Sequence, residues 1–114
     1  MNLFTSAISL IVAFSVAFVW TFRFHNVQKE FILFGLSDLT RSLVGVSKIA
    51  LSTLLVAGIW HADLVLIPAI LMGLFMVAAQ YFHFKVKNPF IKHLPSLVLL
   101  TLSIAIALGS LDTL

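Results

Sequence analysis

Three polar side chains lie within apolar stretches of this sequence and could do chemistry there: Lys48, Gln80 and His83. A lysine ammonium can bind an anion or the carbonyl oxygen of a quinone, and a histidine can exchange a proton near neutral pH. On a helix, the spacing of Gln80 and His83 puts both on one face. We therefore take these residues as candidates for a polar or ligand-binding site within a membrane.

Each candidate also has a structural explanation. A lysine inside a membrane span costs roughly 2.5–3.5 kcal/mol on insertion scales. The stem of Lys48 could extend its charge to the headgroups, or the charge could face the interior of a helix bundle and bind a ligand. A histidine near the end of a span could be a hydrogen-bonded structural residue or a proton carrier. The sequence leaves these alternatives open.

The sequence contains no motif for nucleophilic catalysis, metal binding or phosphate binding. The chain has no cysteine, which excludes thiolate nucleophiles and thiolate metal sites. No two histidines have the spacing of a helical metal site, so no metal ligand is predicted. Glycine-rich phosphate loops, serine elbows and paired carboxylates are also missing from the sequence. We predict no catalytic residue and favour a protein that is not an enzyme.

The composition indicates that the solvent is a lipid bilayer. Hydrophobic residues make up 61% of the 114 residues and charged residues only 10%. A soluble domain of this length would need more charge to cover its surface. The net charge of +3 arises mainly from Lys and Arg at the ends of apolar runs, which is not the pattern of a nucleic-acid-binding face.

Four apolar segments qualify as membrane spans. Each has about 18–20 residues, enough to cross a hydrocarbon core of about 30 Å as a helix. The predicted spans are 3–22, 42–60, 64–82 and 94–111. We predict an all-α fold, a single transmembrane domain over 1–114 that forms an antiparallel four-helix bundle. In the first span, small residues recur at every fourth position and predict one packing face: Thr5, Ser9, Ala13, Ala17 and Thr21.

Two linkers carry every Lys and Arg except Lys48. By the positive-inside bias, linkers 23–41 and 85–93 are expected in the cytoplasm and both termini outside. The apolar stretch 31–36 predicts either a segment in the headgroup region, with Lys29 and Glu30 facing water, or a lid over a cavity between the helices. We expect Pro95 to start the last span.

Several of these segments resemble the DoxX-like family of small four-helix membrane proteins. The resemblance lies in Glu30-Phe31 with Phe34-Gly35-Leu36, and in the run Lys85-Val86-Lys87-Asn88-Pro89. It implies a four-helix bundle in the cytoplasmic membrane. The family takes its name from a subunit of a thiosulfate:quinone oxidoreductase, and other members are associated with redox homeostasis or with assembly of membrane proteins. Family members often have an acidic residue where this chain has Lys48.

These observations lead to two functional hypotheses. The first is an accessory or assembly subunit that works through helix contacts with another membrane protein or a second copy of the chain. The alternative is a quinone-linked oxidoreductase subunit, with a site between the helices lined by Lys48, Gln80 and His83. The first hypothesis predicts no cofactor, and the alternative requires a quinone.

Overall fold

The protein is a bundle of four long helices. The computed structural model describes residues 3–113, apart from the side chains of residues 62, 112 and 113. All four long helices are long and apolar enough to cross a membrane, which confirms the predicted all-α membrane fold. These are α1 (Leu3–Phe22), α3 (Asp38–Ala57), α4 (Leu66–Lys85) and α5 (Phe90–Thr113). A short helix α2 (Phe24–Leu33) and a 3₁₀ turn η1 (Ala62–Leu64) lie in the connections.

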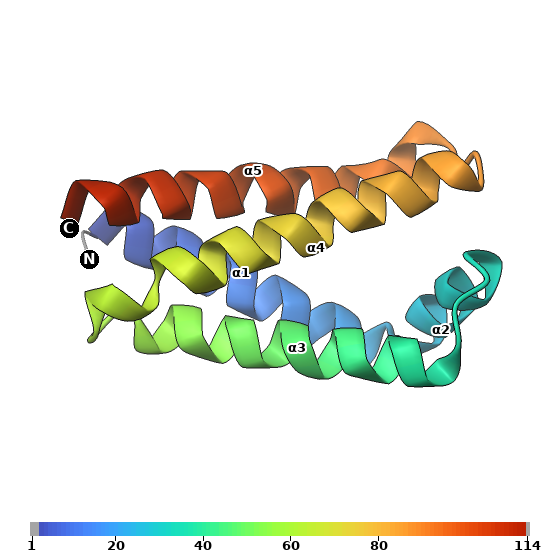
Figure 1. Cartoon of the computed structure of the whole chain (residues 1–114), viewed down its shortest axis with the longest axis horizontal. Helices are drawn as coiled ribbons and strands as arrows, with labels where there is room; N and C mark the ends of the chain where they lie inside the picture. The colour runs from blue at the N-terminus through green and yellow to red at the C-terminus, as the bar shows by residue number, and fades with distance from the viewer. Residues whose placement is uncertain (1–2, 114) are drawn as a thin grey trace.

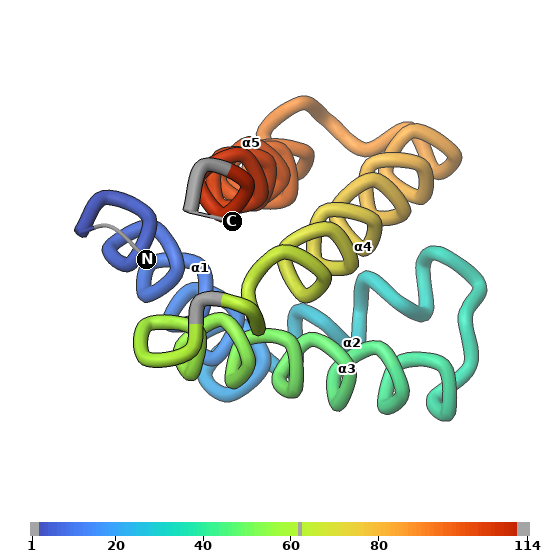
Figure 2. The backbone as a smooth tube through the Cα atoms, turned by 60° about the vertical axis from the view of Figure 1, so that its left-hand side comes forward, coloured from blue at the N-terminus to red at the C-terminus, as the bar shows by residue number. Residues whose placement is uncertain are grey.

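The long helices alternate in direction, so both ends of the chain lie at one end of the bundle and both basic linkers at the other (Figure 1). Each long helix packs against its neighbours in sequence, and α1 also packs against α5. The α4–α5 pair has the most extensive contact and the α3–α4 pair the least. The bundle measures 40 × 24 × 20 Å. Figures 1 and 2 show α3 and α4 diverging toward the end that carries α2.

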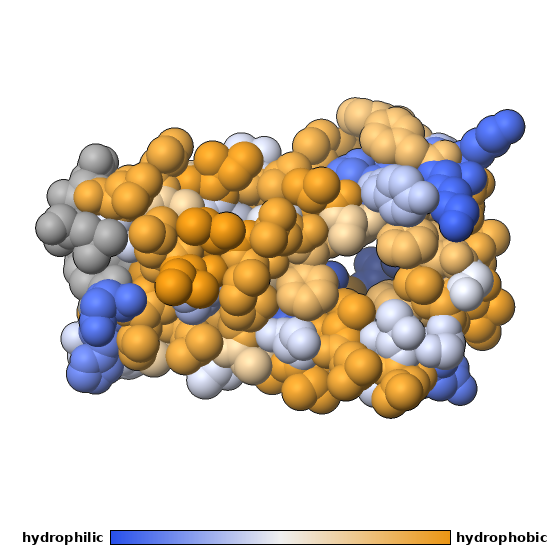
Figure 3. Space-filling model, in the orientation of Figure 1, coloured by the Kyte–Doolittle hydropathy of each residue, from blue (hydrophilic) through white to orange (hydrophobic). Residues whose placement is uncertain are grey.

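Toward the chain termini the interior is mostly apolar, with a few buried hydroxyl side chains such as Thr5, Ser9 and Ser103. Val12, Leu55, Met72 and Ile106 are completely buried there and pack together. The outer surface is almost as apolar as the core, as the orange face in Figure 3 shows. Lipid covers such a surface in a membrane, so hydrophobic residues need not be confined to the interior.

The small residues of α1 do not form one packing face. Thr5 and Ser9 are buried, Ala17 is half-buried and Thr21 is exposed. A four-residue spacing on a helix of 3.6 residues per turn advances by roughly 40° at each step. The stripe therefore begins inside the bundle, where Thr5 lies against Gly109 of α5, and ends on the surface between α1 and α3.

The helix ends at the linkers follow local sequence signals. Ser37 is the N-cap of α3, and its hydroxyl accepts a hydrogen bond from the Thr40 amide at 3.1 Å. Pro89 immediately precedes α5, a position that needs no backbone N–H. The last helix thus begins at Phe90 rather than near 94, and Pro95 lies inside it instead of starting it.

Gly109 tests the close packing of α1 on α5. A methyl group added at Gly109 would overlap the Thr5 hydroxyl, so Gly109→Ala should destabilise the protein by about 1–3 kcal/mol. The measurement is thermal unfolding in a mild detergent. Gly73→Ala is the matched control, because its methyl would lie 3.8 Å from Leu100 and Ser103. An equal loss of stability in both variants would contradict this account.

Candidate ligand site

A polar cavity lies within the bundle at the end where α3 and α4 diverge. Its volume is about 270 Å³, and side chains from all five α-helices line it. Figure 3 shows a hollow in this part of the surface with hydrophilic atoms at its floor. The polar and charged lining residues are Ser15, Arg23, Asn26, Glu30, Lys48, His83, Lys92 and Ser96. Among the residues that the structure describes, no three His, Asp or Glu side chains group as a metal site would require.

Lys48 projects into this cavity. Because α3 begins at Asp38, Lys48 lies roughly 15 Å along the helix, near its middle. Its Nζ atom is 5.8 Å from the ring centroid of Trp20 in α1 and 6.0 Å from that of Phe75 in α4. The electron-rich faces of such rings attract a cation. The ammonium is thus directed toward the bundle interior and not along α3 to the headgroups.

The short helix α2 closes the cavity. Val27 and Phe34 are buried, and the Phe34 ring stacks on Phe82 of α4 with centroids 5.4 Å apart. Glu30 lies between them in sequence and lines the cavity, whereas Lys29 is exposed. Of the two arrangements that the sequence left open, α2 therefore has that of a lid. The expectation that Glu30 faces water is wrong, since a helix anchored by Val27 and Phe34 turns position 30 inward.

The surroundings of Glu30 in the cavity change the pKa of its carboxyl group. Burial raises the pKa of Glu30 above its ordinary value, although the nearby charges of Lys92, Lys48 and Arg23 oppose that rise. The folded protein thus binds a proton at Glu30 more readily than the unfolded chain does. Glu30 is the acidic group of a cavity whose other charged lining residues are cationic.

His83 is held beside the cavity by a hydrogen bond from Asn88. The Asn88 side-chain amide donates to Nδ1 of His83 at 2.8 Å. A neutral imidazole that accepts at Nδ1 carries its proton on Nε2. The ring is buried and lines the cavity, and the Phe34 ring contacts it edge-on at 5.2 Å. Asn88 therefore selects the tautomer in which Nε2–H is the donor.

Gln80 joins α4 to α5 beside the cavity. Its Nε2 donates to the His93 carbonyl at 2.8 Å and to the Ser96 hydroxyl at 2.7 Å, and its Oε1 lies 2.9 Å from Nδ1 of His93. Nε2 of His93 lies 3.2 Å from the Asn88 carbonyl. Both ring nitrogens of His93 therefore lie within hydrogen-bond distance of oxygen atoms. Gln80 thus has a full set of partners within the hairpin.

The structure separates the three candidates taken from the sequence. Lys48 and His83 line one cavity, whereas Gln80 does not line it and bonds to the base of α5. Sequence reasoning missed Arg23, Glu30 and Lys92 as cavity residues. For Glu30, a signal was present in the sequence. The apolar segment 31–36 next to it predicts a contact with the bundle, and such a contact brings Glu30 close to the helices. Arg23 and Lys92 carried no such signal, since interfacial cations are common at helix ends.

Replacing Gln80 tests the hairpin network. Gln80→Met keeps similar volume but removes the hydrogen bonds of Gln80 to the His93 carbonyl, the Ser96 hydroxyl and Nδ1 of His93, so stability should fall by about 1–3 kcal/mol. Thermal unfolding in detergent measures the change. Tyr81→Phe is the control, because it removes a polar group from an exposed neighbouring position. If Gln80→Met unfolds at the same temperature as the parent, the network does not support the hairpin.

The comparisons with known proteins agree with this architecture. The model of the DoxX-like family matches residues 4–106, which covers α3 and α4 completely and most of α1 and α5. Comparison with curated proteins and with solved structures gives no match. The family match covers most of the chain, including every lining residue of the cavity. This small multi-pass membrane protein belongs to the DoxX-like family.

Proposed function

We propose that this protein binds a small amphiphile of the quinone class, with its oxygen-bearing head in the cavity between the helices. The observation that carries the proposal is that Lys48 and His83 both line this cavity, and that the Asn88 amide bonded to Nδ1 leaves the His83 proton on Nε2. Both groups donate hydrogen bonds, and quinone carbonyl oxygens accept them. A ligand that supplies oxygen atoms gives these two donors acceptors within the cavity.

The size of the cavity is consistent with such a head. Its volume of about 270 Å³ is near the lower end of ligand pockets, which run from roughly 300 to 1,000 Å³. It suits one small ring. Trp20 beside Lys48 adds an apolar wall for a ring face, and Glu30 adds a carboxyl group that can exchange a proton with solvent or ligand. A quinone, when bound, would supply the capacity to carry electrons and protons.

The accessory or assembly function is the second candidate. It draws on the broad apolar outer surface, which a neighbouring membrane protein or a second copy of this chain could cover. Lipid covers such a surface equally well. The polar cavity, by contrast, calls for a specific occupant, and for this reason ligand binding is the stronger proposal.

Replacing Lys48 tests the ligand proposal. A tailless benzoquinone should bind the purified parent protein, and Lys48→Met should weaken its binding roughly 10–100-fold, the equivalent of one lost hydrogen bond to a charged group. Lys85→Met is the matched control, because Lys85 is exposed and does not line the cavity. The measurement is a binding isotherm in mild detergent, with mass spectrometry of co-purified small molecules.

Two results would reverse the choice between the candidates. If the parent binds no benzoquinone and carries no co-purified quinone, the ligand proposal fails. A stoichiometric membrane protein that co-purifies in its place would support the accessory function. Equal binding by Lys48→Met and the parent would remove Lys48 from the site.

We further propose that the protein lies in the cytoplasmic membrane with linkers 23–41 and 85–93 in the cytoplasm and both termini outside. Because the chain has no cysteine, single cysteines can report on each side. In sealed vesicles of known orientation, Lys87→Cys should react only with reagent on the cytoplasmic side, and His61→Cys only with reagent outside. Both positions are exposed and lie in connections at opposite ends of the bundle. Reaction of Lys87→Cys from outside would invert the orientation.

A further inference from the structure

The polar cavity carries more positive charge than its own acid can balance. Three cationic side chains line it, those of Arg23, Lys48 and Lys92, and Glu30 is the one acid among its described lining residues. The excess is therefore two positive charges when Glu30 is ionised and three when Glu30 is protonated. Charges that are removed from bulk water need a partner nearby, because the hydration that they lose is costly.

None of these cations forms an ion pair within the described part of the chain. The one ion pair there joins Arg41 to Asp38 at 2.9 Å, and neither of those residues lines the cavity. In the orientation of the Asn26 amide that satisfies its hydrogen bonds, its oxygen accepts from the Arg23 guanidinium at 3.0 and 3.3 Å. An amide is neutral, however, so the positive charge of Arg23 stays unbalanced.

The three cations are spread along the depth of the cavity. Arg23 follows α1 and Lys92 lies in the first turn of α5, so both lie at the linker end of the bundle, where they are exposed. Lys48 is half-buried and lies near the middle of α3. Each of the three acts electrostatically on the Glu30 carboxyl group. A ligand head that reaches Lys48 therefore lies in the field of all three charges.

We propose that the cavity selects an amphiphile whose ring head carries a negative charge, such as a quinone with an acidic hydroxyl group, over a neutral quinone of the same size. The inference rests on the proposed function and names the chemical class of its ligand. An ionised hydroxyl group supplies the counter-charge that Glu30 alone does not, and its oxygen accepts charge-assisted hydrogen bonds. Arg23 and Lys92 provide the selection, and Lys48 contributes to the binding of both kinds of head.

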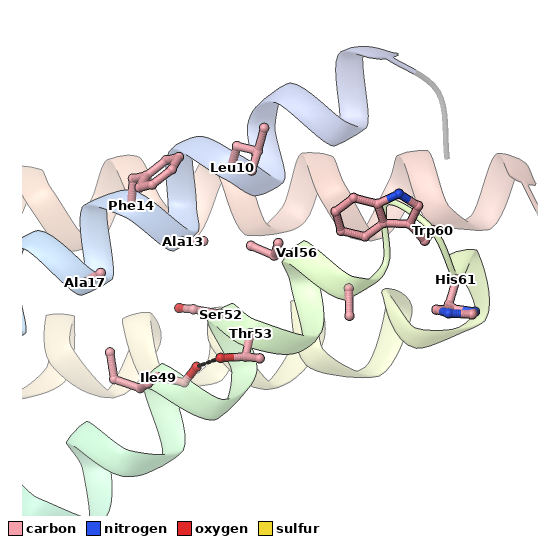
Figure 4. A pocket seen from close by; sticks show the side chains of 11 residues that line it. Leu10, Ala13, Phe14, Ala17, Ile49, Ser52, Thr53, Val56, Trp60 and His61 are labelled. Carbon is pink, nitrogen blue, oxygen red and sulfur yellow. Dashed lines mark hydrogen bonds between the residues drawn. The ribbon is translucent and has the colours of Figure 1, made fainter.

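The hollow in Figure 4 shows what an uncharged surface of this protein offers instead. Its volume is about 680 Å³, and it is lined by Ala13 and Ala17 of α1 and by Ile49 and Val56 of α3. No Lys, Arg, Asp or Glu among the described residues lines it. A ring that only partitions onto such an apolar surface gains nothing from a negative charge. A preference for the anion therefore identifies binding in the polar cavity.

A matched pair of ring heads tests the selection. The probes are trimethylbenzoquinone, which is neutral, and its hydroxy derivative, which is ionised at neutral pH. Binding isotherms of the full-length protein in an uncharged detergent should give a dissociation constant about tenfold lower for the ionised probe. Salt screens the attraction between partly exposed charges, so a salt concentration of about 1 M should remove most of this preference.

Variants assign the selection to particular residues. Arg23→Gln combined with Lys92→Gln should reduce the preference to within about twofold, whereas Arg23→Lys with Lys92→Arg keeps both charges and should retain it. Glu30→Gln should strengthen binding of the ionised probe by about threefold or more, because it removes the negative charge of the cavity lining. Lys29→Gln is the matched control, because Lys29 is exposed on the same helix as Glu30 and does not line the cavity. It should leave the preference unchanged.

The outcomes separate this inference from the proposed function. If the neutral probe binds in a Lys48-dependent manner but the ionised probe binds no more tightly, the charge selection is overturned and the proposed function stands. A preference that persists without Arg23 and Lys92, or that Lys29→Gln also reduces, overturns it as well. Should the double variant bind neither probe, the parent decides, because a preference that survives high salt is not electrostatic. If the parent binds neither probe, the proposed function fails and this inference fails with it.

Discussion

A lysine ammonium in the middle of a membrane helix cannot face lipid without a large energetic cost, and the half of this bundle that carries the basic linkers is arranged around that constraint. Lys48 lies near the centre of α3 and points inward between the rings of Trp20 and Phe75. A charge there needs a polar surrounding, and the divergence of α3 from α4 makes room for one. The position of the Lys48 ammonium at the middle of α3 therefore accounts for a polar cavity at this level of the bundle.

Three local features make the cavity compatible with a stable bundle. Gly45 has no side chain, so the Trp20 ring packs directly against α3 and forms one side of the cavity. The helix α2, anchored by Val27 and Phe34, covers the end and brings Glu30 toward the excess of positive charge. The α4–α5 hairpin holds the opposite wall through bonds from Gln80 to His93 and Ser96. The extensive packing of α4 on α5 keeps that wall fixed where α3 and α4 separate.

The side-chain packing thus differs between the two ends of the bundle. Near the chain termini, small and medium side chains fill the bundle interior, and contacts such as Thr5 on Gly109 bring helices close. Near the linkers, aromatic rings surround polar groups, and Phe34, Phe82 and His83 form one such contact group. Close packing thus fills one end of the bundle, and a polar cavity lies at the other.

Much of this architecture follows from the sequence alone. Hydropathy and length determine four spans, since an uninterrupted apolar run of this length has no other stable form in lipid, and short connections make consecutive spans neighbours. The depth of Lys48 and the apolar segment before Ser37 were also visible in the sequence. The tertiary structure decided which polar residues meet. The rotation of each helix, the direction of Gln80 toward α5 and the inward turn of Glu30 depend on contacts between segments far apart in the chain, which neither periodicity nor residue type specifies.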